Sequence, residues 1–523
     1  MSSRRPVSRF GGNGLNELLA GASELRTPEA ICHLPIIYML AFSALALGGC
    51  RFAYAGEGAN PELSTVQTAP LLPPDALKQI AAFGGLRSSI EDAGVKFTFT
   101  YYGDAMGNPS GGVQQGAGYS GRFGAIIDGD LEKLIGWSGG AFHASVHEIF
   151  GHGLSANNLD NLMLVSSIEA PNSTRLFNLW IEQKLDSHSS LLVGQYTAAQ
   201  EFLVSKSANL FVNSTFGWPV ITAQDLPSGG PAYPIGALGA RFLYKPNDQI
   251  VLRAAVFDGN PAGPGAGDPV TRDPHGLAFR LGDPVFMIAE MVFRYNQSHP
   301  DASQNNVQQE GERAGASGDL SASEPSLNQQ GLPRSVKFGA WYIAGSFADP
   351  RFNAQDGLLA ASGGQPLEHA GNFSAYGVFD QMIWRAAPGG DRGLSFFLRA
   401  TGAPSDRNLI DFYVDTGLAF KGLFDSRPND SLGIAFAYSR VSPRVAAYGQ
   451  DLDAVTKIAA PIRDFEAVFE LTYQYQLAKN WTLQPDVQYI VHPGANVADP
   501  QVRTGVAPIP NAAVVGLRTI LKF

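Results

Sequence analysis

The chain has 523 residues with a formal net charge of −10, and 16% of its residues are charged. Soluble domains usually carry ~25% charged residues, and the negative balance without clustered Lys and Arg argues against nucleic-acid binding. A mean hydropathy of −0.04 is too low for a bundle of spanning helices, but it is compatible with membrane strands that alternate apolar and polar residues.

Residues 1–55 are predicted to form a leader with a signal peptide. The uncharged run Leu34–Leu47 is shorter than the ~20 residues of a spanning helix and fits a signal-peptide core. The small-x-small triplet Ala53–Ala55 predicts cleavage after Ala55, so that the mature chain begins at Gly56.

Two features leave alternatives open at this end of the chain. The leader is long and contains Glu, so the true start is either Met1 or Met39, and the residues before Cys50 resemble a lipoprotein cleavage box. An anchor that is never cleaved is a further alternative. Cleavage after Ala55 would remove Cys32 and Cys50, and the mature protein would then have neither a disulfide nor a Cys-ligated metal.

Residues 56–93 are predicted to be a Pro-rich spacer and a short helix, with helix-like spacing of apolar residues over Asp75–Ile90. The first strand is expected over Val95–Tyr102, because its apolar and polar residues alternate with a period of two. A Gly- and Pro-containing turn is expected at Gly107–Gly112. Residues 94–523 are assigned to one barrel domain.

The same alternation recurs along the rest of the chain, in segments close to the ~9–11 residues that a tilted strand needs to cross a bilayer. The clearest are Leu176–Leu185, 240–245, 287–295, Phe465–Leu477, Trp481–Val491 and Ala512–Phe523. This repetition predicts an all-β fold, a transmembrane antiparallel up-and-down β-barrel. We expect 16 strands within a range of 16 to 18, since bacterial barrels take even numbers; Leu159–Ala170 and Phe202–Val220 are ambiguous.

The outward rows of these strands should lack Lys and Arg, because a charge at the lipid midplane costs about 2–4 kcal/mol. In Leu176–Leu185 we expect Phe177 outward with Leu179 and Ile181. One strand departs from the rule, since Asp380 shares a row with Val378 and Trp384. A β-bulge or a position near the membrane rim would account for it.

Two long connections differ in character. Gln297–Arg334 is polar and is expected to be an exposed loop. Gln195–Pro234 contains Phe202, Phe211 and Trp218 among several prolines, which is too apolar for a free loop, and we expect it to fold into the lumen and narrow it.

The inward rows supply the candidate contacts for a solute. A sugar presents hydroxyls at its edge and apolar C–H patches on its faces, so a channel for it needs charged or amide groups together with aromatic rings. The alternative interpretation is that these side chains keep the wall wet and pair across strands. The pore-lining candidates are Trp180, Glu182, Lys184, Arg241, Arg253, Glu290, Arg294, Arg399, Glu466, Glu470, Gln474, Gln488 and Arg518.

A metalloprotease interpretation of the stretch His147–His152 fails on spacing. A zincin needs histidines at i and i+4 of a helix, but Gly151 stands at that position. The segment alternates as a strand, with His143, Ser145 and His147 on one face. We expect ordinary lumen or rim histidines, no catalytic residue, no metal site and no cofactor.

The sequence resembles the carbohydrate-selective porin (OprB) family from about Leu86 to Phe523. The similar motifs are Leu179–Gln183, Val193–Gln195, Glu201–Phe202, Phe211–Ser214, Pro231–Pro234, Ala237–Arg241, Val256–Pro261 and Asp486–Ile490. The resemblance implies a sixteen-stranded bacterial outer-membrane porin that passes mono- and oligosaccharides passively into the periplasm. It also implies that the outer-membrane assembly machinery reads the terminal Phe523.

Several alternatives remain at this point. The protein works as a monomer or a homotrimer in contact with outer-membrane lipids. A channel of similar build for another small solute, such as an organic acid, is the first rival function. A barrel adhesin or barrel enzyme is the second.

Overall fold

The computed structural model describes residues 86–297, 331–388, 390–502 and 506–523. The predicted leader, signal peptide and most of the spacer lie outside the described residues, as does most of the polar stretch Gln297–Arg334. Of the helix expected over Asp75–Ile90, the described part contains α3 (Leu86–Asp92).

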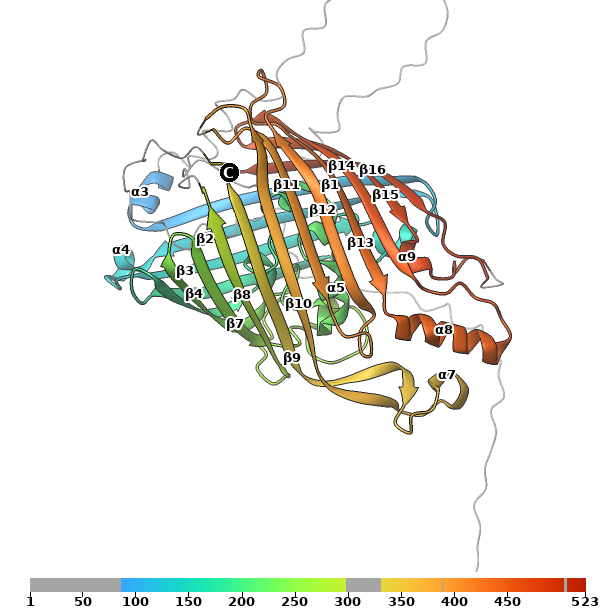
Figure 1. Ribbon diagram of the computed structural model, residues 1–523. Helices are drawn as coiled ribbons and strands as arrows, with labels where there is room; N and C mark the ends of the chain where they lie inside the picture. The colour runs from blue at the N-terminus through green and yellow to red at the C-terminus, as the bar shows by residue number, and fades with distance from the viewer. Residues whose placement is uncertain (1–85, 298–330, 389, 503–505) are drawn as a thin grey trace, which may run out of the picture. The chain divides into compact units, whose positions relative to one another are not determined.

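The described residues form sixteen antiparallel strands that close into one barrel, which confirms the predicted fold class (Figure 1). Each strand pairs with its neighbours in the sequence, and the last pairs with the first. The strands are β1 (Val95–Ser110), β2 (Gly116–Asp130), β3 (Gly140–His152), β4 (Ser173–Lys184), β5 (Ser189–Tyr196), β6 (Ala237–Asn247), β7 (Ile250–Asp258), β8 (Val285–Tyr295), β9 (Arg334–Asn353), β10 (Pro366–Arg385), β11 (Gly393–Gly402), β12 (Ile410–Lys421), β13 (Ser431–Val441), β14 (Phe465–Ala478), β15 (Trp481–Val491) and β16 (Ala512–Lys522).

The barrel closes between β1 and β16. Asp104 is the register partner of Arg518, and Tyr101 is that of Leu521. Phe523 continues this ladder, because its backbone N–H donates to the carbonyl oxygen of Phe99 at 2.9 Å and its own carbonyl accepts from the Phe99 N–H at 3.2 Å.

Alternation along the strands sorts side chains to the two faces of the wall as predicted. On β14 and β15, Phe469, Leu471 and Val487 are about half exposed on the outer face, while Glu470 and Gln488 are buried on the inner face. Glu470 and Gln488 are also register partners. Backbone pairing around the closed wall satisfies the peptide groups that a bilayer cannot.

The connections between strands contain short helices. In the described residues none of the helices is long and apolar enough to span a membrane. They are α4 (Leu131–Ile135), η2 (Ser155–Leu159), η3 (Ala198–Gln200), η4 (Ala208–Leu210), η5 (Ser214–Phe216), α5 (Val220–Asp225), η6 (Pro227–Gly229), α6 (Pro269–Arg272), α7 (Leu359–Ser362), α8 (Pro443–Thr456) and α9 (Pro493–Asn496).

Long connections follow β3, β5, β7, β13 and β15 at one end of the barrel, whereas at the other end those after β4, β6 and β14 are short and only the one after β8 is long. Bacterial barrels carry their longer loops on the outer side, so the end of the barrel at which β3 ends faces the exterior. At this end α8 packs against α7 and β9. Arg351 of β9 binds Asp451 of α8 at 2.7 Å.

Two strands differ from the expected boundaries or faces. β1 runs on to Ser110, through the residues expected to form a turn. On β10 the row of Val378 and Asp380 faces inward, so the prediction that it faces lipid was wrong. A bulge is present, but it lies after Asp380, where Ile383 has no partner in the β11 register and Trp384 returns to the outer face.

Candidate functional site

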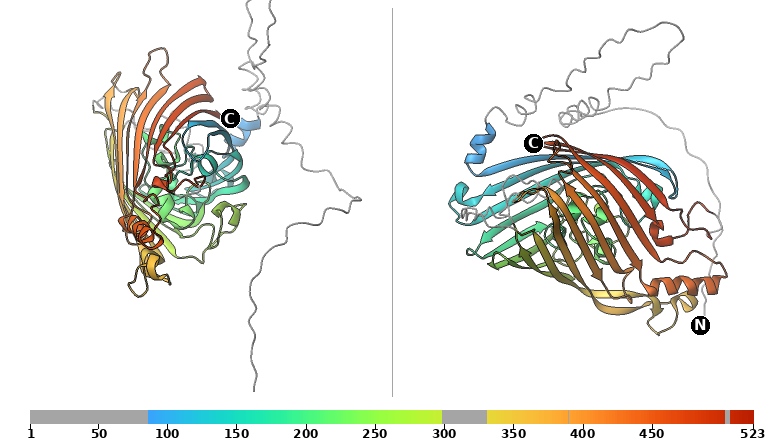
Figure 2. Two further views of the ribbon diagram at one scale, coloured as in Figure 1. Left: turned by 90° about the vertical axis from the view of Figure 1, so that its right-hand side faces the viewer. Right: turned by 45° about the horizontal axis from the view of Figure 1, so that its top comes forward.

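Two segments fold into the barrel from its exterior end. The first inward segment (residues 154–170) joins β3 to β4, and the second inward segment (residues 197–236) joins β5 to β6; α5 of the second lies inside the wall (Figure 2). The prediction for Gln195–Pro234 is confirmed. The ambiguous stretch Leu159–Ala170 is likewise an inward segment and contains no strand.

Both segments pack on the apolar part of the inner wall. Met163 and Val165 of the first segment and Phe211, Phe216 and Ile221 of the second are buried in one cluster. The wall residues of that cluster include Phe397, Tyr413, Ala437, Val468, Ile490 and Val514. The interior beside β11–β16 is therefore a packed core and not open water.

Carboxylates of the inner wall bind the backbone of the inward segments. Glu466 accepts from the N–H groups of Leu162 and Met163 at 2.8 and 2.7 Å, and from Gly494 at 2.8 Å. Glu470 accepts from Val212 and Asn213 at 2.5 and 3.0 Å. Each carboxylate thus satisfies peptide groups that would otherwise be buried without a partner.

Gln488 and Arg518 hold the first inward segment in the same way. The Gln488 amide donates to the carbonyl oxygen of Val165 at 2.8 Å. Arg518 binds Asp104 through two hydrogen bonds of 2.8 and 2.7 Å and donates to the Ser167 hydroxyl at 3.0 Å. The segment is therefore fixed to β15 and β16.

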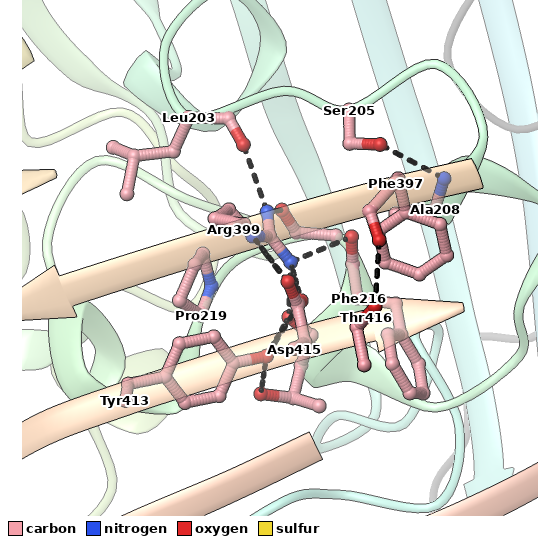
Figure 3. A network of polar contacts seen from close by, with 12 residues as sticks. Leu203, Ser205, Ala208, Phe216, Pro219, Phe397, Arg399, Tyr413, Asp415 and Thr416 are labelled. Carbon is pink, nitrogen blue, oxygen red and sulfur yellow. Dashed lines mark hydrogen bonds and ion pairs between the residues drawn. The ribbon is translucent and has the colours of Figure 1, made fainter. Parts of the chain in front are cut away.

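Arg399 of β11 has the most extensive set of contacts (Figure 3). Its Nε donates to both carboxylate oxygens of Asp415 on β12, at 3.2 and 3.1 Å. Its two terminal nitrogens donate to four carbonyl oxygens of the second inward segment, and Nη2 also bonds to Asp415. The four carbonyls belong to Leu203 (2.8 Å), Gly217 (3.2 Å), Thr215 (2.9 Å) and Phe216 (3.1 Å).

Four of the predicted residues group at β4–β8. Arg241 lies between Glu182 and Glu201, with N–O distances of 3.0 Å to each. Arg253 faces Glu290 at 3.7 Å and donates to the carbonyl oxygen of Glu201. These charges pair with one another and with the second inward segment.

The other predicted residues are placed differently. Trp180 is buried and stacks on His143, with ring centroids 5.0 Å apart. Arg294 and Gln474 are half-buried at inner positions, and Lys184 is exposed at the end of β4. Nine of the thirteen candidates are buried, namely Trp180, Glu182, Arg241, Glu290, Arg399, Glu466, Glu470, Gln488 and Arg518.

A second group of inner-wall residues, on β2, β3 and β4, was not among the predicted pore-lining candidates, although His143, Ser145 and His147 were expected to share one face. A bulge in the pairing of β3 with β4 leaves Phe177 without a register partner. Phe177 is consequently buried inside, where it stacks on His147 at 4.5 Å, so its predicted outward position was wrong. The same bulge turns Arg175 inward, opposite His147.

This inner group, which we call the β2–β4 track, combines rings with polar atoms that lack partners. Within the described residues no hydrogen-bond partner is found for Asp128 Oδ2, His143 Nε2, Ser145 Oγ, either amide atom of Asn178 or any guanidinium nitrogen of Arg175. Arg175 is 1% exposed, and its ion pair with Asp273 is 3.8 Å long. Buried polar groups are normally satisfied, so this cluster is a part of the inner wall in which hydrogen-bonding capacity is left over.

Tyr233 of the second inward segment faces this track. Its ring lies 5.9 Å from that of Phe177 and 6.1 Å from that of His147. The Arg122 guanidinium lies over the Tyr233 ring at 5.4 Å. The track is therefore bounded by the wall on one side and by the second inward segment on the other.

The histidines of the sequence His147–His152 lie on β3, as predicted, and His143, Ser145 and His147 share its inner face. Among the described residues no group of three or more His, Cys, Asp or Glu side chains is placed to hold a metal ion. The arrangement can offer a sugar hydrogen bonds and ring faces.

A closed sixteen-stranded barrel whose interior is narrowed by inward segments defines the porin class. The sequence matches the family described as "Carbohydrate-selective porin, OprB family" over residues 114–523, more than half of the chain. The chain belongs to this family. It is an outer-membrane β-barrel channel for carbohydrates.

Two relatives illustrate the similarity. Porin B of Pseudomonas aeruginosa is 23% identical over 504 residues, which cover 91% of this chain and 97% of that protein. The high-pH structure of Pseudomonas putida OprB superposes with a TM-score of 0.70 at 24% identity, covering 84% of this chain and 97% of the other. This likeness confirms the fold.

Proposed function

We propose that mono- and oligosaccharides cross the barrel along the β2–β4 track, passively and down their gradient into the periplasm. The observation that carries this proposal is the clustering of polar atoms without partners beside the Phe177, His147 and Tyr233 rings. Hydroxyls of a sugar would pair with Asn178 and Arg175, while its C–H faces would lie on the rings.

Binding along such a track should be weak. A millimolar dissociation constant already corresponds to about 4 kcal/mol, and conduction requires that a solute also leave. Passage along the track involves no coupled reaction in this proposal, so net flux of the solute would run only down its concentration gradient. Conduction without any chemical change of the solute is the activity that we assign to this barrel.

Most of the predicted pore-lining residues take a different part in this proposal. Trp180, stacked on His143, is a candidate for direct contact with sugar. The buried carboxylates and guanidinium groups, by contrast, act by placing the inward segments. Phe523, paired with Phe99 at the barrel seam, is proposed to be read by the outer-membrane assembly machinery.

A liposome-swelling series with sugars of increasing size tests the proposal. We expect purified protein to admit monosaccharides fastest and longer oligosaccharides progressively more slowly. Swelling that is no faster than in protein-free liposomes, for every sugar, would rule the proposal out. Heat-modifiable migration in electrophoresis serves as the control for a folded barrel.

A second candidate solute is a small organic acid, which the Arg175 guanidinium favours because it lacks hydrogen-bond partners among the described residues. Planar-bilayer conductance separates the two candidates. Sugars should block the current in a concentration-dependent way. A current that resists sugars but falls on addition of a hydroxycarboxylate would favour the organic acid.

A further inference from the structure

We infer that Arg399, together with its register partner Asp415, is the positioning residue that sets the width of the sugar passage. It does so by fixing the second inward segment against the wall opposite the β2–β4 track. This inference rests on the proposed function, because it assumes that solute passes along that track.

The Arg399 side chain joins two parts of the second inward segment that are distant in the sequence. It binds the carbonyl oxygen of Leu203 at one point and those of Thr215, Phe216 and Gly217 at another. A planar guanidinium with five N–H donors in a fixed fork can hold several acceptors at once. Lysine, with three donors on one atom, could not reproduce this geometry.

Asp415 fixes the direction in which Arg399 points. Its carboxylate accepts hydrogen bonds from Nε of Arg399, and also from the Tyr413 hydroxyl at 2.8 Å. Thr215 of the segment in turn donates its hydroxyl to the oxygen of Tyr413 at 3.0 Å. The clamp therefore joins two wall strands to two stretches of the segment, and its wall side chains Arg399, Tyr413 and Asp415 are fully buried.

Leu203 shows that the clamp maintains a backbone shape that the segment would not favour alone. Its φ of 59° is in the left-handed region, which is unfavourable for a residue with a Cβ,. Its N–H donates to Glu290 of β8 at 3.1 Å, and its carbonyl accepts from Arg399 at 2.8 Å. Buried charges on two strands thus hold one peptide residue from both sides.

The same segment carries Tyr233 to the solute side. Between the clamp and Tyr233, the Trp218 indole donates to the carbonyl oxygen of Gly229 at 3.1 Å, and Ile410 of β12 donates its N–H to Asp225 at 3.3 Å. The first contact joins two parts of the segment, and the second joins the segment to β12. If the clamp is released, the part of the second inward segment around Tyr233 should be able to move away from β3 and β4. The passage between them would then be wider.

Three variants test the clamp in the full-length porin. Arg399→Met removes the donors at similar length, Arg399→Lys keeps the charge without the fork, and Arg399→Met/Asp415→Leu removes both charges so that no unpaired ion is buried. Each should raise the swelling rate with disaccharides several-fold relative to monosaccharides, and raise single-channel conductance and open-channel noise. The control is Arg427→Met, which breaks the ion pair with Asp430 (2.8 Å) at the turn before β13 and should change none of these.

Two further measurements separate positioning from a general loss of structure. Arg399→Ala should regain the disaccharide exclusion of the parent when millimolar ethylguanidinium is added, whereas the parent and Arg427→Met should not respond. In the parent, hydrogen exchange of residues 203–217 should be as slow as that of the strands. Fast exchange there, or folded Arg399 variants that keep the parental size limit, would overturn the inference. Failure of the parent itself to admit any sugar would instead refute the proposed function.

Discussion

Arg399 and Asp415 are register partners on β11 and β12, and both side chains are fully buried, at 0% exposure. A guanidinium and a carboxylate removed from water repay their desolvation only when nearly all their hydrogen bonds are made. Here the inward segment supplies the acceptors that Asp415 alone could not. The pair and the segment consequently stabilise one another.

Removal of one partner of this pair should be far more costly than removal of both. We expect Arg399→Met to lower the free energy of unfolding by about 3–5 kcal/mol, because Asp415 is left buried and unpaired. Arg399→Met/Asp415→Leu should recover most of that loss. Urea unfolding of the purified barrel in lipid vesicles measures both, and equal losses for the single and double variants would contradict the prediction.

The outer face of β14 should not tolerate a cation. Leu471 lies midway along the strand and is 49% exposed on the lipid side. Leu471→Arg is expected to destabilise the barrel by about 2–4 kcal/mol, the range for a charge near the bilayer midplane. Leu471→Met is the matched control. The extent of spontaneous folding into vesicles at increasing urea gives the difference, and an arginine variant as stable as the control would show that this face does not meet hydrocarbon.

Asp225, in the second inward segment, should make stability depend on pH. Burial raises the pKa of its carboxyl well above the usual range, so the folded chain holds a proton that the unfolded chain releases above its pKa of about 3.9. The contribution of the neutral carboxyl is complete below that value and is lost as the pH rises toward the folded pKa. Asp225→Asn imitates the neutral form at every pH.

The stability advantage of Asp225→Asn over the parent should therefore grow with rising pH, by at most about 1.4 kcal/mol per pH unit. Urea midpoints for both proteins at pH 4, 6 and 8 provide the comparison. Parallel pH profiles would mean that Asp225 ionises in the folded barrel much as it does in water.

Arg175 should contribute directly to solute affinity. Arg175→Met retains the unbranched apolar stem of the side chain but removes the guanidinium nitrogens from the β2–β4 track. Hydrogen bonds to charged groups contribute about 1.5–3 kcal/mol, which corresponds to a roughly tenfold to hundredfold weaker sugar block of the current. Arg440→Met, at an ion pair of 2.8 Å with Asp411 beside the exterior rim, is the control. An unchanged block in Arg175→Met would place the solute elsewhere in the barrel.

The barrel could be predicted from sequence because a period of two is a local signal that repeats in strand after strand. Its faces were predicted correctly wherever pairing is regular, as along β14–β16. The prediction of the face was wrong at Phe177 and on the row of Asp380. In each strand a bulge adds one residue, so that the residues on its two sides do not follow one alternation. A bulge has no distinct signature in either stretch, so Phe177 was assigned to the outer face.

The sequence predicted which charged side chains face inward, but it did not predict which groups they bind. Glu470 was correctly assigned to the inner row, but its partners are the backbone N–H groups of Val212 and Asn213, more than two hundred residues earlier. Nothing local encodes such a contact. The apolar content of Gln195–Pro234 did indicate that this segment enters the lumen, although it could not indicate which wall residues would receive it.

Because β1 pairs with β16, the barrel is complete only when the first and last strands have both been inserted and have paired. The second neighbour of β1 is β16, and the two are joined at the end of the ladder by backbone hydrogen bonds between Phe99 and Phe523. Before they pair, β1 and β16 each expose a row of peptide groups without hydrogen-bond partners. Such an edge is costly in hydrocarbon and can pair with another copy of the chain. A mutation that prevents β16 from pairing would therefore also leave β1 without one of its two neighbours.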